Sequence, residues 1–386
     1  MLSTVTSGEV VLVGAGHAHL HVASRAASFR ERGIGLTLID PDAFWYSGLA
    51  TGMLGGEYEP ELDRVDPRPL VESGGGRFIR DRVVGLDGDD GQALLASGAR
   101  LPYDVISFNV GSEVATPAGM TVAETAWRAK PIRGLLDLRR SVEEALSPGS
   151  GRGSGALRAL VIGSGDTGCE IAANLDALAR SHDAAIHVTL ITDAPRVLAE
   201  RSGLISKRVA RLVRGRGIDV HTDATVVEVG GDGCRTDDGR FMPGDLMILA
   251  TGLRPPGWLA DLGLELGAEG GLLVEATLRS VSDPNVFGAG DCVSLVGHEL
   301  PKLGVYAVRE APVLYRNLLA AASGEPLSDY RPQKRCLTIL NLGRGTGLAV
   351  WGPLHWLGPA AMWLKDRLDR RFLALYREGS DGTEPD

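Results

Sequence analysis

Residues 156–175 read ALRALVIGSGDTGCEIAANL, and this stretch decides the fold. An apolar run leads into a glycine turn, and a helical stretch follows. Gly163, Gly165 and Gly168 satisfy the pattern G-x-G-x-x-G. The first glycine permits a tight turn, the second lets the backbone approach a pyrophosphate, and the third lets the helix pack closely on the strand. The stretch predicts a dinucleotide-binding β-α-β unit with the pyrophosphate at the helix N-terminus.

A related pattern opens the chain, where residues 11–25 read VLVGAGHAHLHVASR. Gly14 and Gly16 are kept, but His19 takes the place of the third glycine. We expect this larger side chain to hold the following helix slightly further from the sheet without loss of the phosphate site. The next apolar run ends at Asp40, and a carboxylate there can accept hydrogen bonds from ribose hydroxyls. A second dinucleotide site is therefore predicted.

Three histidines at alternate positions, His17, His19 and His21, raise the alternative of a metal site. On a strand they would share one face, but on the helix that follows the turn His19 points away from the other two. No acidic or cysteine ligand lies nearby in the sequence. We therefore predict no metal, and we expect His17 to be the histidine closest to the nucleotide.

Composition limits the classes of function. A net charge of −9 argues against broad nucleic-acid binding, which needs a basic surface. No signal peptide is recognised at the start, so a cytoplasmic location is expected. The cysteines are widely spaced and form no C-x-x-C motif, which favours a reduced compartment over a disulfide framework or a zinc site. They are Cys169, Cys234, Cys292 and Cys336.

Two such units predict an α/β fold with two Rossmann-like dinucleotide-binding domains, the first split in sequence around the second, and a small C-terminal lobe. An antiparallel meander is expected within residues 78–110, and a flexible loop at 147–155. The predicted boundaries are 1–130 and 255–325 for the two parts of the first domain, 131–254 for the second domain, and 326–386 for the lobe.

The C-terminal tail has two unusual segments. Residues 345–364 carry no charged side chain and would be long enough to span a bilayer, but two prolines and four glycines make a continuous helix unfavourable. The next segment is basic and amphipathic, which fits a helix lying on the inner face of a membrane. A dimer interface or a cap on the first domain is the alternative, and it is slightly favoured because the sequence shows no exposed face. The predicted apolar stripe consists of Leu364, Leu368, Phe372 and Leu375.

Four motifs together resemble the pyridine nucleotide-disulfide oxidoreductase superfamily over nearly the whole chain. They are VGAGHAH, IGSGDTGCE, LATGLRP (249–255) and VFGAGDCV (286–293). The resemblance implies FAD on the first unit and NAD(P)H on the second. It also implies that Asp291 binds the ribityl and pyrophosphate region of the flavin, and that Glu170, as the catalytic residue, sits by the nicotinamide. Two further motifs, GHAHLH and WLKDRLDRRFLALY, resemble a subgroup often fused ahead of selenophosphate synthetase, and more broadly type II NADH dehydrogenases and sulfide:quinone reductases.

The expected cofactor contacts follow from the motifs and the resemblance. For NAD(P)H they are Gly163, Gly165, Gly168 and Glu170. For FAD they are Gly14, Ala15, Gly16, His17, Asp40, Val83, Gly111, Gly290, Asp291 and Lys302, with Lys302 near the flavin ring.

Departures from the family pattern bear on the electron acceptor. Residues 44–56 hold no cysteine pair, so no dithiol relay is expected. Cys169 and Cys336 are not placed as sulfide reductases require, and residues 301–310 lack the glutamines that face the quinone in type II NADH dehydrogenases. The expected function is an NAD(P)H:acceptor oxidoreductase with a quinone as acceptor. A reductase of a small redox protein and a flavin-bound sensor with little turnover are the alternatives.

The choice between NADH and NADPH stays open. Thr192 ends the second strand of the second unit, where a glutamate would favour NADH, and Asp193 and Arg196 follow. The basic run at 206–217 is expected to be a solvated helix face, because Val209, Leu212 and Val213 supply one apolar side at helical spacing.

Overall fold

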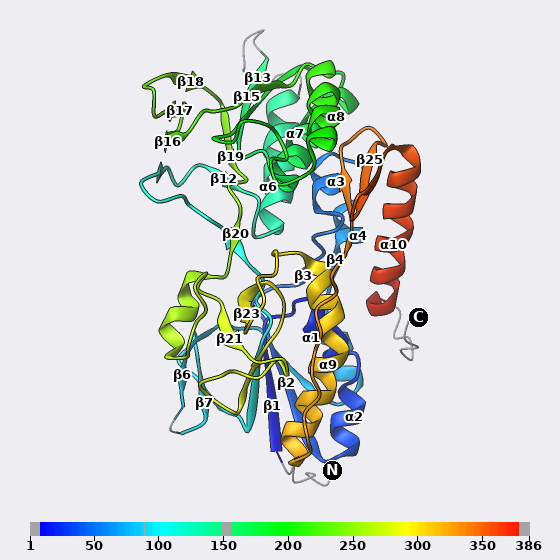
Figure 1. Ribbon diagram of the computed structural model, residues 1–386. Helices are drawn as coiled ribbons and strands as arrows, with labels where there is room; N and C mark the ends of the chain where they lie inside the picture. Colours follow the sequence, from blue (N-terminus) through cyan, green and yellow to red (C-terminus); the bar gives the residue numbers. More distant parts are fainter. Residues whose placement is uncertain (1–7, 89, 148–155, 378–386) are drawn as a thin grey trace.

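The computed structural model describes residues 8–88, 90–147 and 156–377, which form two sheet-based halves and a C-terminal lobe (Figure 1). In the first half a parallel five-stranded sheet has the order β22-β9-β1-β2-β5. Strand β22 comes from a segment far along the chain and pairs with β9, so the first unit is completed by the later sequence. The strands are β1 (Gly8–Val13), β2 (Ile34–Ile39), β5 (Arg77–Ile79), β9 (Val105–Phe108) and β22 (Val286–Gly288).

Apolar residues explain the central position of β1. Its last four residues are buried, as are nearly all residues of β2 and all of β9, which is typical of a parallel sheet covered on both faces. The helices of this half are α1 (His17–Ala23), α2 (Ala26–Glu31), α3 (Ala50–Leu54), α4 (Pro60–Asp63), α5 (Pro67–Ser73) and α9 (Gly304–Ser323). Helix α9 packs on α1 and contacts the sheet.

Small antiparallel sheets, one short parallel pair (β21-β23) and turns complete the first half. The expected meander is present as one three-stranded sheet, β6-β7-β8. The short elements are β3 (Phe44–Trp45), β4 (Arg64–Val65), β6 (Val83–Asp87), β7 (Gln92–Leu95), β8 (Arg100–Pro102), β21 (Leu272–Val274), β23 (Val293–Leu295), and the 3₁₀ turns η1 (Gly257–Leu262) and η2 (Gly290–Cys292).

The second half repeats the arrangement with a parallel sheet of order β12-β19-β13-β14-β15. Its strands are β12 (Trp127–Arg128), β13 (Leu157–Ile162), β14 (Ile186–Ile191), β15 (Asp219–His221) and β19 (Leu246–Leu249), and its helices are α6 (Arg133–Leu146), α7 (Asp166–Ser181) and α8 (Gly203–Gly215). A second sheet, β11-β16-β17-β18, and the pair β10-β20 flank it. These are β10 (Glu113–Val114), β11 (Thr121–Val122), β16 (Val226–Val229), β17 (Gly233–Thr236), β18 (Phe241–Pro243) and β20 (Leu253–Arg254).

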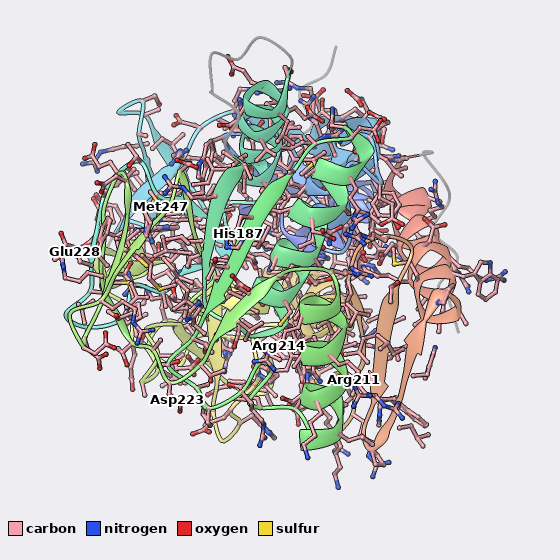
Figure 2. All side chains as sticks on the ribbon, turned by 90° about the horizontal axis from the view of Figure 1, so that it is seen from above. His187, Arg211, Arg214, Asp223, Glu228 and Met247 are labelled. Atoms are coloured by element: carbon pink, nitrogen blue, oxygen red, sulfur yellow. The ribbon has the colours of Figure 1, made fainter. Side chains whose placement is uncertain are left out.

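Helix α8 carries the basic run, and the prediction of a solvated face is confirmed. Val209 and Val213 are buried, whereas Arg211 and Arg214 are exposed. Figure 2 shows both arginines on α8. Cys292 is fully buried, as expected for a small packing residue, and the four cysteines are unpaired.

The C-terminal lobe consists of an antiparallel sheet, β24-β25-β26, and one long helix. The elements are β24 (Leu337–Asn341), β25 (Gly347–Trp351), β26 (Leu354–Gly358) and α10 (Pro359–Arg377). The uncharged segment at 345–364 therefore forms a hairpin and the first turn of α10. No helix among the described residues is long and apolar enough to cross a bilayer. In Figure 1 helix α10 runs alongside β25, and it contacts all three strands of this sheet and β4 of the first half.

The predicted last helix is present as α10, and the residues of its apolar stripe are half-buried or exposed. Leu368 is 43% exposed, and the buried side of α10 includes the charged pair Lys365 and Asp369. Lys365 donates to the carbonyl of Gly48 and to Asp369, and Asp369 accepts a hydrogen bond from the hydroxyl of Tyr46. Because these polar groups satisfy one another, they can be buried against the first half. Periodicity of apolar residues alone could not reveal this face.

Candidate functional site: two glycine turns and the groups around them

The second glycine turn, between β13 and α7, is packed so tightly that only glycine fits at two of its positions. A methyl group added at Gly163, whose φ is +107°, would overlap the carbonyl of Ala250. One added at Gly168 would overlap the carbonyl of Gly163. One added at Gly165 would meet nothing within 4 Å, because Gly165 faces open space at the start of α7. This open space, lined by the N–H groups of a helix start, fits a diphosphate.

The first turn, between β1 and α1, is held by different groups. Gly14 has φ +85°, and a methyl group at Gly16 would overlap the side chain of Asn109. The amide of Ala15 donates to Oδ2 of Asp40 at 2.7 Å, so the acid at the end of β2 fastens the turn. Burial raises the pKa of Asp40. The sequence analysis assigned Gly14, Ala15, Gly16 and Asp40 to one site, and the structure brings them together in this turn. The closeness of Asn109 to Gly14 and Gly16 was not predicted.

His19 stands at the position of the third glycine, and both nitrogens of its ring have hydrogen-bond partners there. The ring is fully buried, with Nδ1 2.6 Å from the carbonyl oxygen of Gly14 and Nε2 2.9 Å from Oγ of Ser107. Burial lowers the pKa of His19 to about 4, so the ring is neutral at physiological pH. His21 interacts with Arg25, and His17 with aromatic rings. The three histidines thus have separate environments, and no group of three potential metal ligands occurs within the described residues.

Asn109, directly after β9, links both ends of the first unit. Its Oδ1 accepts the backbone N–H groups of Ala18 and His19 at 2.9 and 3.2 Å, which satisfies donors at the start of α1. Its Nδ2 donates to the carbonyl of Ala289 at 2.6 Å. Sequence reasoning missed this residue. The available signal was a polar residue immediately after a buried strand, at the edge of the sheet where ligands bind.

Asp291 lies at the end of β22 in a polar cluster. Its Oδ2 accepts hydrogen bonds from Oγ of Ser112 at 2.7 Å and from Nζ of Lys130 at 3.2 Å. Burial opposes ionisation, but Lys130 and the Ser112 hydroxyl outweigh it and lower the pKa of Asp291. The neighbouring Gly290 donates its N–H to Glu310 at 2.6 Å. Asp291 is therefore a fixed negative charge, and Ser112 and Lys130 are partners that the motif could not indicate.

His17, the first residue of α1, lies among aromatic rings from distant segments. Its ring centroid is 5.0 Å from that of Phe44, 5.6 Å from that of Tyr46 and 5.5 Å from that of Phe372. Burial lowers the pKa of His17 to about 4, although Asp291 acts in the opposite direction. Because Phe372 belongs to α10, the C-terminal lobe reaches the first glycine turn.

Glu170 lies where three parts of the molecule meet. It stands in the second turn of α7, and its Oε1 accepts the N–H of Asn341 from β24 at 2.6 Å and approaches the hydroxyl of Thr51 from α3 at 3.4 Å. Burial raises the pKa of Glu170 to about 7. A carboxyl group with this pKa can hold or release a proton near neutral pH. Its place beside the nicotinamide stays a prediction.

Three further residues were expected to contact FAD, and the structure places each of them in its own surroundings. Lys302 donates to the carbonyl of Val293 at 3.1 Å and forms an ion pair with Glu269 at 3.3 Å. Val83 is buried in β6. Gly111 has φ +72°, and a methyl group there would meet nothing within 4 Å. Their roles toward FAD stay predictions.

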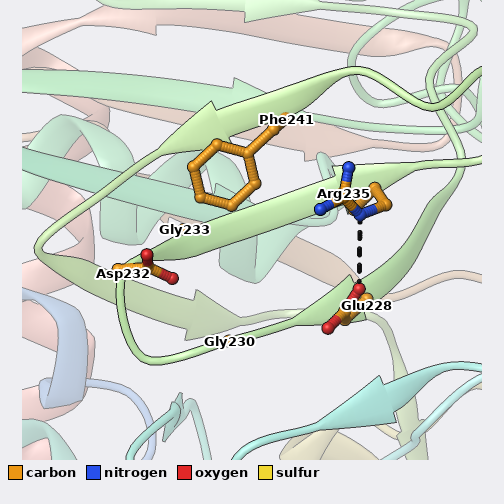
Figure 3. Close-up of a pocket in the computed structure, with 6 residues that line it drawn as sticks. All are labelled: Glu228, Gly230, Asp232, Gly233, Arg235 and Phe241. Carbon is orange, nitrogen blue, oxygen red and sulfur yellow. Dashed lines mark hydrogen bonds and ion pairs between the residues drawn. The ribbon is translucent and has the colours of Figure 1, made fainter.

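A shallow groove elsewhere is formed by β16, β17 and β18 (Figure 3). Arg235 pairs with Glu228 across it at 3.4 Å. It contains no residue of either glycine turn, and we assign it no part in the chemistry. Its lining residues are Glu228, Gly230, Asp232, Gly233, Arg235 and Phe241.

An unpaired acid lies beneath α10. Asp63 is fully buried, and no described residue donates a hydrogen bond to either of its carboxylate oxygens. Burial, reinforced by the carboxylate of Asp369, raises the pKa of Asp63 to about 8, although Lys365 opposes the rise. The folded chain therefore keeps a proton on Asp63 that the unfolded chain loses near pH 4.

Replacing Asp63 by asparagine should flatten the pH dependence of stability. Since the native state binds the extra proton between about pH 4 and 8, the free energy of unfolding falls as the pH rises through this range. We expect Asp63→Asn to remove on the order of 4 kcal/mol of that fall between pH 5 and pH 8. The measurement is denaturant unfolding of both proteins at pH 5 and pH 8. If the free energy of unfolding falls by the same amount from pH 5 to pH 8 in both proteins, the raised pKa of Asp63 is contradicted.

Comparisons with known proteins agree with this geometry. A family model described as pyridine nucleotide-disulphide oxidoreductase matches residues 8–311. The nitric oxide reductase FlRd-NAD(+) reductase of Aeromonas hydrophila is 36% identical over 319 residues, which cover 77% of this chain and 74% of that protein. The type II NADH:quinone oxidoreductase of Haemophilus influenzae is 25% identical over 201 residues, 49% of this chain and 45% of that one.

A solved structure shows the same fold. The sulfide:quinone oxidoreductase of Aquifex aeolicus superposes with a TM-score of 0.79 at 18% sequence identity, over 97% of this chain and 92% of that one. The prediction of an α/β fold with paired dinucleotide-binding units is confirmed. The match of the family model over most of the chain, with both glycine turns inside it, leads to one conclusion. The chain belongs to the pyridine nucleotide-disulphide oxidoreductase family and is an NAD(P)H oxidoreductase that uses FAD.

Proposed function

We propose that this oxidoreductase passes electrons from NAD(P)H through FAD to a quinone at a membrane surface. When bound, the flavin supplies the chemistry, taking a hydride from the nicotinamide and passing electrons on to the acceptor. The chain's own residues bind and orient the two cofactors. In this proposal Asp40, the first glycine turn and Asp291 hold FAD, and the second turn holds NAD(P)H.

The observation that carries the quinone proposal is the surface of the C-terminal lobe. Residues 331–377 contain nine lysines and arginines and two aspartates, in a chain whose net charge is −9. Lys365 and Asp369 of this set are buried as a pair, which leaves eight basic residues and one acidic residue in this stretch. Trp351, Trp356 and Trp363 are exposed on the same lobe, and Trp363 is 65% exposed. The guanidinium of Arg367 lies 5.8 Å from the Trp363 ring centroid. Exposed tryptophans among basic residues fit the headgroup region of an anionic membrane, and a quinone dissolves in the apolar interior beneath it.

An anaerobic absorbance titration tests the proposed reaction. The purified FAD-containing protein is titrated with NADH and with NADPH, and a short-chain quinone is then added. We expect the flavin absorbance to be lost on reduction and to return on addition of the quinone. If the flavin absorbance is lost but does not return when the quinone is added, the quinone is not the acceptor. The transfer of electrons from NAD(P)H to FAD would still stand.

Binding to vesicles tests the membrane contact. We expect the protein to sediment with vesicles of anionic lipid and not with those of zwitterionic lipid, and to be released by salt. Replacing Trp363 by alanine should weaken sedimentation about tenfold, because the ring loses its apolar contact with the lipid. Phe241, also exposed but outside the lobe, supplies the matched control Phe241→Ala. Equal sedimentation of all three proteins would contradict the proposal.

A second candidate acceptor is a small redox protein. It is favoured by the relative at 36% identity, whose name is that of an FlRd-NAD(+) reductase, and by the same basic surface, which would complement an acidic partner. Turnover with an acidic redox protein, but not with quinones, would select this alternative. A flavin-bound sensor would show turnover with neither the redox protein nor the quinones. The cytoplasmic, membrane-peripheral location, a homodimer, the domain boundaries and the likeness to the subgroup fused to selenophosphate synthetase stay predictions.

A further inference from the structure

Arg201 reaches the start of α7, where the second glycine turn faces open space. The loop from 192 to 202 is fastened to that turn, since the N–H of Leu198 donates to the carbonyl of Ser164 at 2.8 Å. Leu198 is buried and adopts a left-handed backbone conformation, with φ +49°. This anchored loop brings Arg201 against Asp166, the first residue of α7.

Two fixed acceptors orient the guanidinium of Arg201. Nε donates to Oδ1 of Asp166 at 3.2 Å, and Nη2 donates both to Oδ2 of Asp166 and to the hydroxyl of Thr338 at 3.2 Å. Thr338 lies on β24, so the C-terminal lobe helps to hold the side chain. No described residue accepts a hydrogen bond from Nη1, which remains a donor for a ligand. The Arg201 side chain is 23% exposed, so solvent and ligands can reach it.

Charge explains why an arginine is required here. The N-terminus of α7 attracts anions, but the carboxylate of Asp166 stands at the same place and would repel a dinucleotide diphosphate. Arg201 cancels that charge. A guanidinium is also planar and permanently charged, which suits it to phosphate oxygens. We propose that Arg201, oriented by Asp166 and Thr338, binds the diphosphate of NAD(P)H at the second glycine turn.

This inference goes beyond the proposed function because no residue of the loop was assigned to the diphosphate. It depends on NAD(P)H binding at the second turn and not on the identity of the acceptor. The competing explanation is that the pair of Arg201 and Asp166 only anchors the loop. The two explanations differ in what they predict for the loss of Asp166.

A double-mutant cycle with NAD+ as the probe separates them. Binding to the FAD-containing protein is measured by calorimetry for Arg201→Gln, Asp166→Asn and the double variant. We expect Arg201→Gln to weaken binding about 10- to 100-fold, since it removes a charge-assisted donor and leaves Asp166 unopposed. The Asp166→Asn variant should bind NAD+ at least as tightly as the unmodified protein. The double variant should bind at least about fivefold more tightly than Arg201→Gln, because the repelling charge is gone.

Controls keep the outcome clear. Arg214→Gln removes an equal charge from the exposed face of α8 and should leave NAD+ binding unchanged. Thermal unfolding of each variant is measured in parallel, and the double variant should be no more stable than Arg201→Gln, so any recovery of binding comes from charge. Equal losses in Asp166→Asn and Arg201→Gln, with no recovery in the double variant, would overturn the inference alone. Failure of the unmodified protein to bind NAD+ would overturn the assignment of the second turn as well.

Discussion

Gly168→Ala should weaken NAD(P)H binding about a hundredfold and lower the free energy of unfolding by about 3 kcal/mol. The added methyl group would overlap the carbonyl of Gly163, which is backbone and has no room to move aside. Helix α7 must then shift away from β13, and its first N–H groups leave the positions that face the diphosphate. Calorimetry with NAD+ and thermal unfolding measure the two effects.

Two other glycines provide controls for packing and for binding. At Gly215, near the end of α8, a methyl group meets nothing within 4 Å, so Gly215→Ala should change neither property. At Gly165 a methyl group also meets no protein atom, but it would project into the open space at the start of α7. Gly165→Ala should therefore keep full stability and lose NAD(P)H affinity. If it binds as tightly as the unmodified protein, the diphosphate does not lie at this turn.

Asp291→Ala should give a purified protein that is nearly colourless and less stable by about 3 kcal/mol. The substitution removes the acceptor shared by Ser112 and Lys130. The Lys130 side chain is only 18% exposed, and it would lose its negatively charged partner and keep only the Ser112 hydroxyl as an acceptor. It also removes the fixed negative charge that the family resemblance places against the flavin's ribityl chain. The ratio of flavin to protein absorbance and the Tm measure the two effects.

Asp291→Asn separates charge from shape at the same site. Asparagine retains an oxygen acceptor for Ser112, so we expect intermediate FAD content and a smaller loss of stability. Asp238, an exposed acid that bonds to Thr236 and Arg240 in the second half, serves as the charge control through Asp238→Ala, which should retain FAD. A fully yellow Asp291→Ala protein would show that FAD does not depend on this carboxylate.

Several charged groups of the fold could not be placed by motif reasoning. Asp291 and Lys130 were both visible in the sequence, but their pairing joins residues 161 positions apart. Tyr46 and Asp369 are 323 positions apart. Apolar periodicity placed Leu368 on one stripe of the last helix, but it could not indicate that the charged Lys365 and Asp369 are buried in the same helix. Such pairs are favourable only when the partner is present, and a local pattern contains no information about a distant partner.

The amino-acid sequence alone determined the two glycine turns and the strands that precede them. These depend on backbone conformation and apolar burial within about twenty residues, which local sequence encodes directly. Tertiary structure alone decided that Asn109 caps α1, that Glu170 meets Asn341, and that α10 brings Phe372 to His17. Each of these contacts joins segments whose proximity results only from the packing of the whole chain, where burial and hydrogen-bond partners are set together.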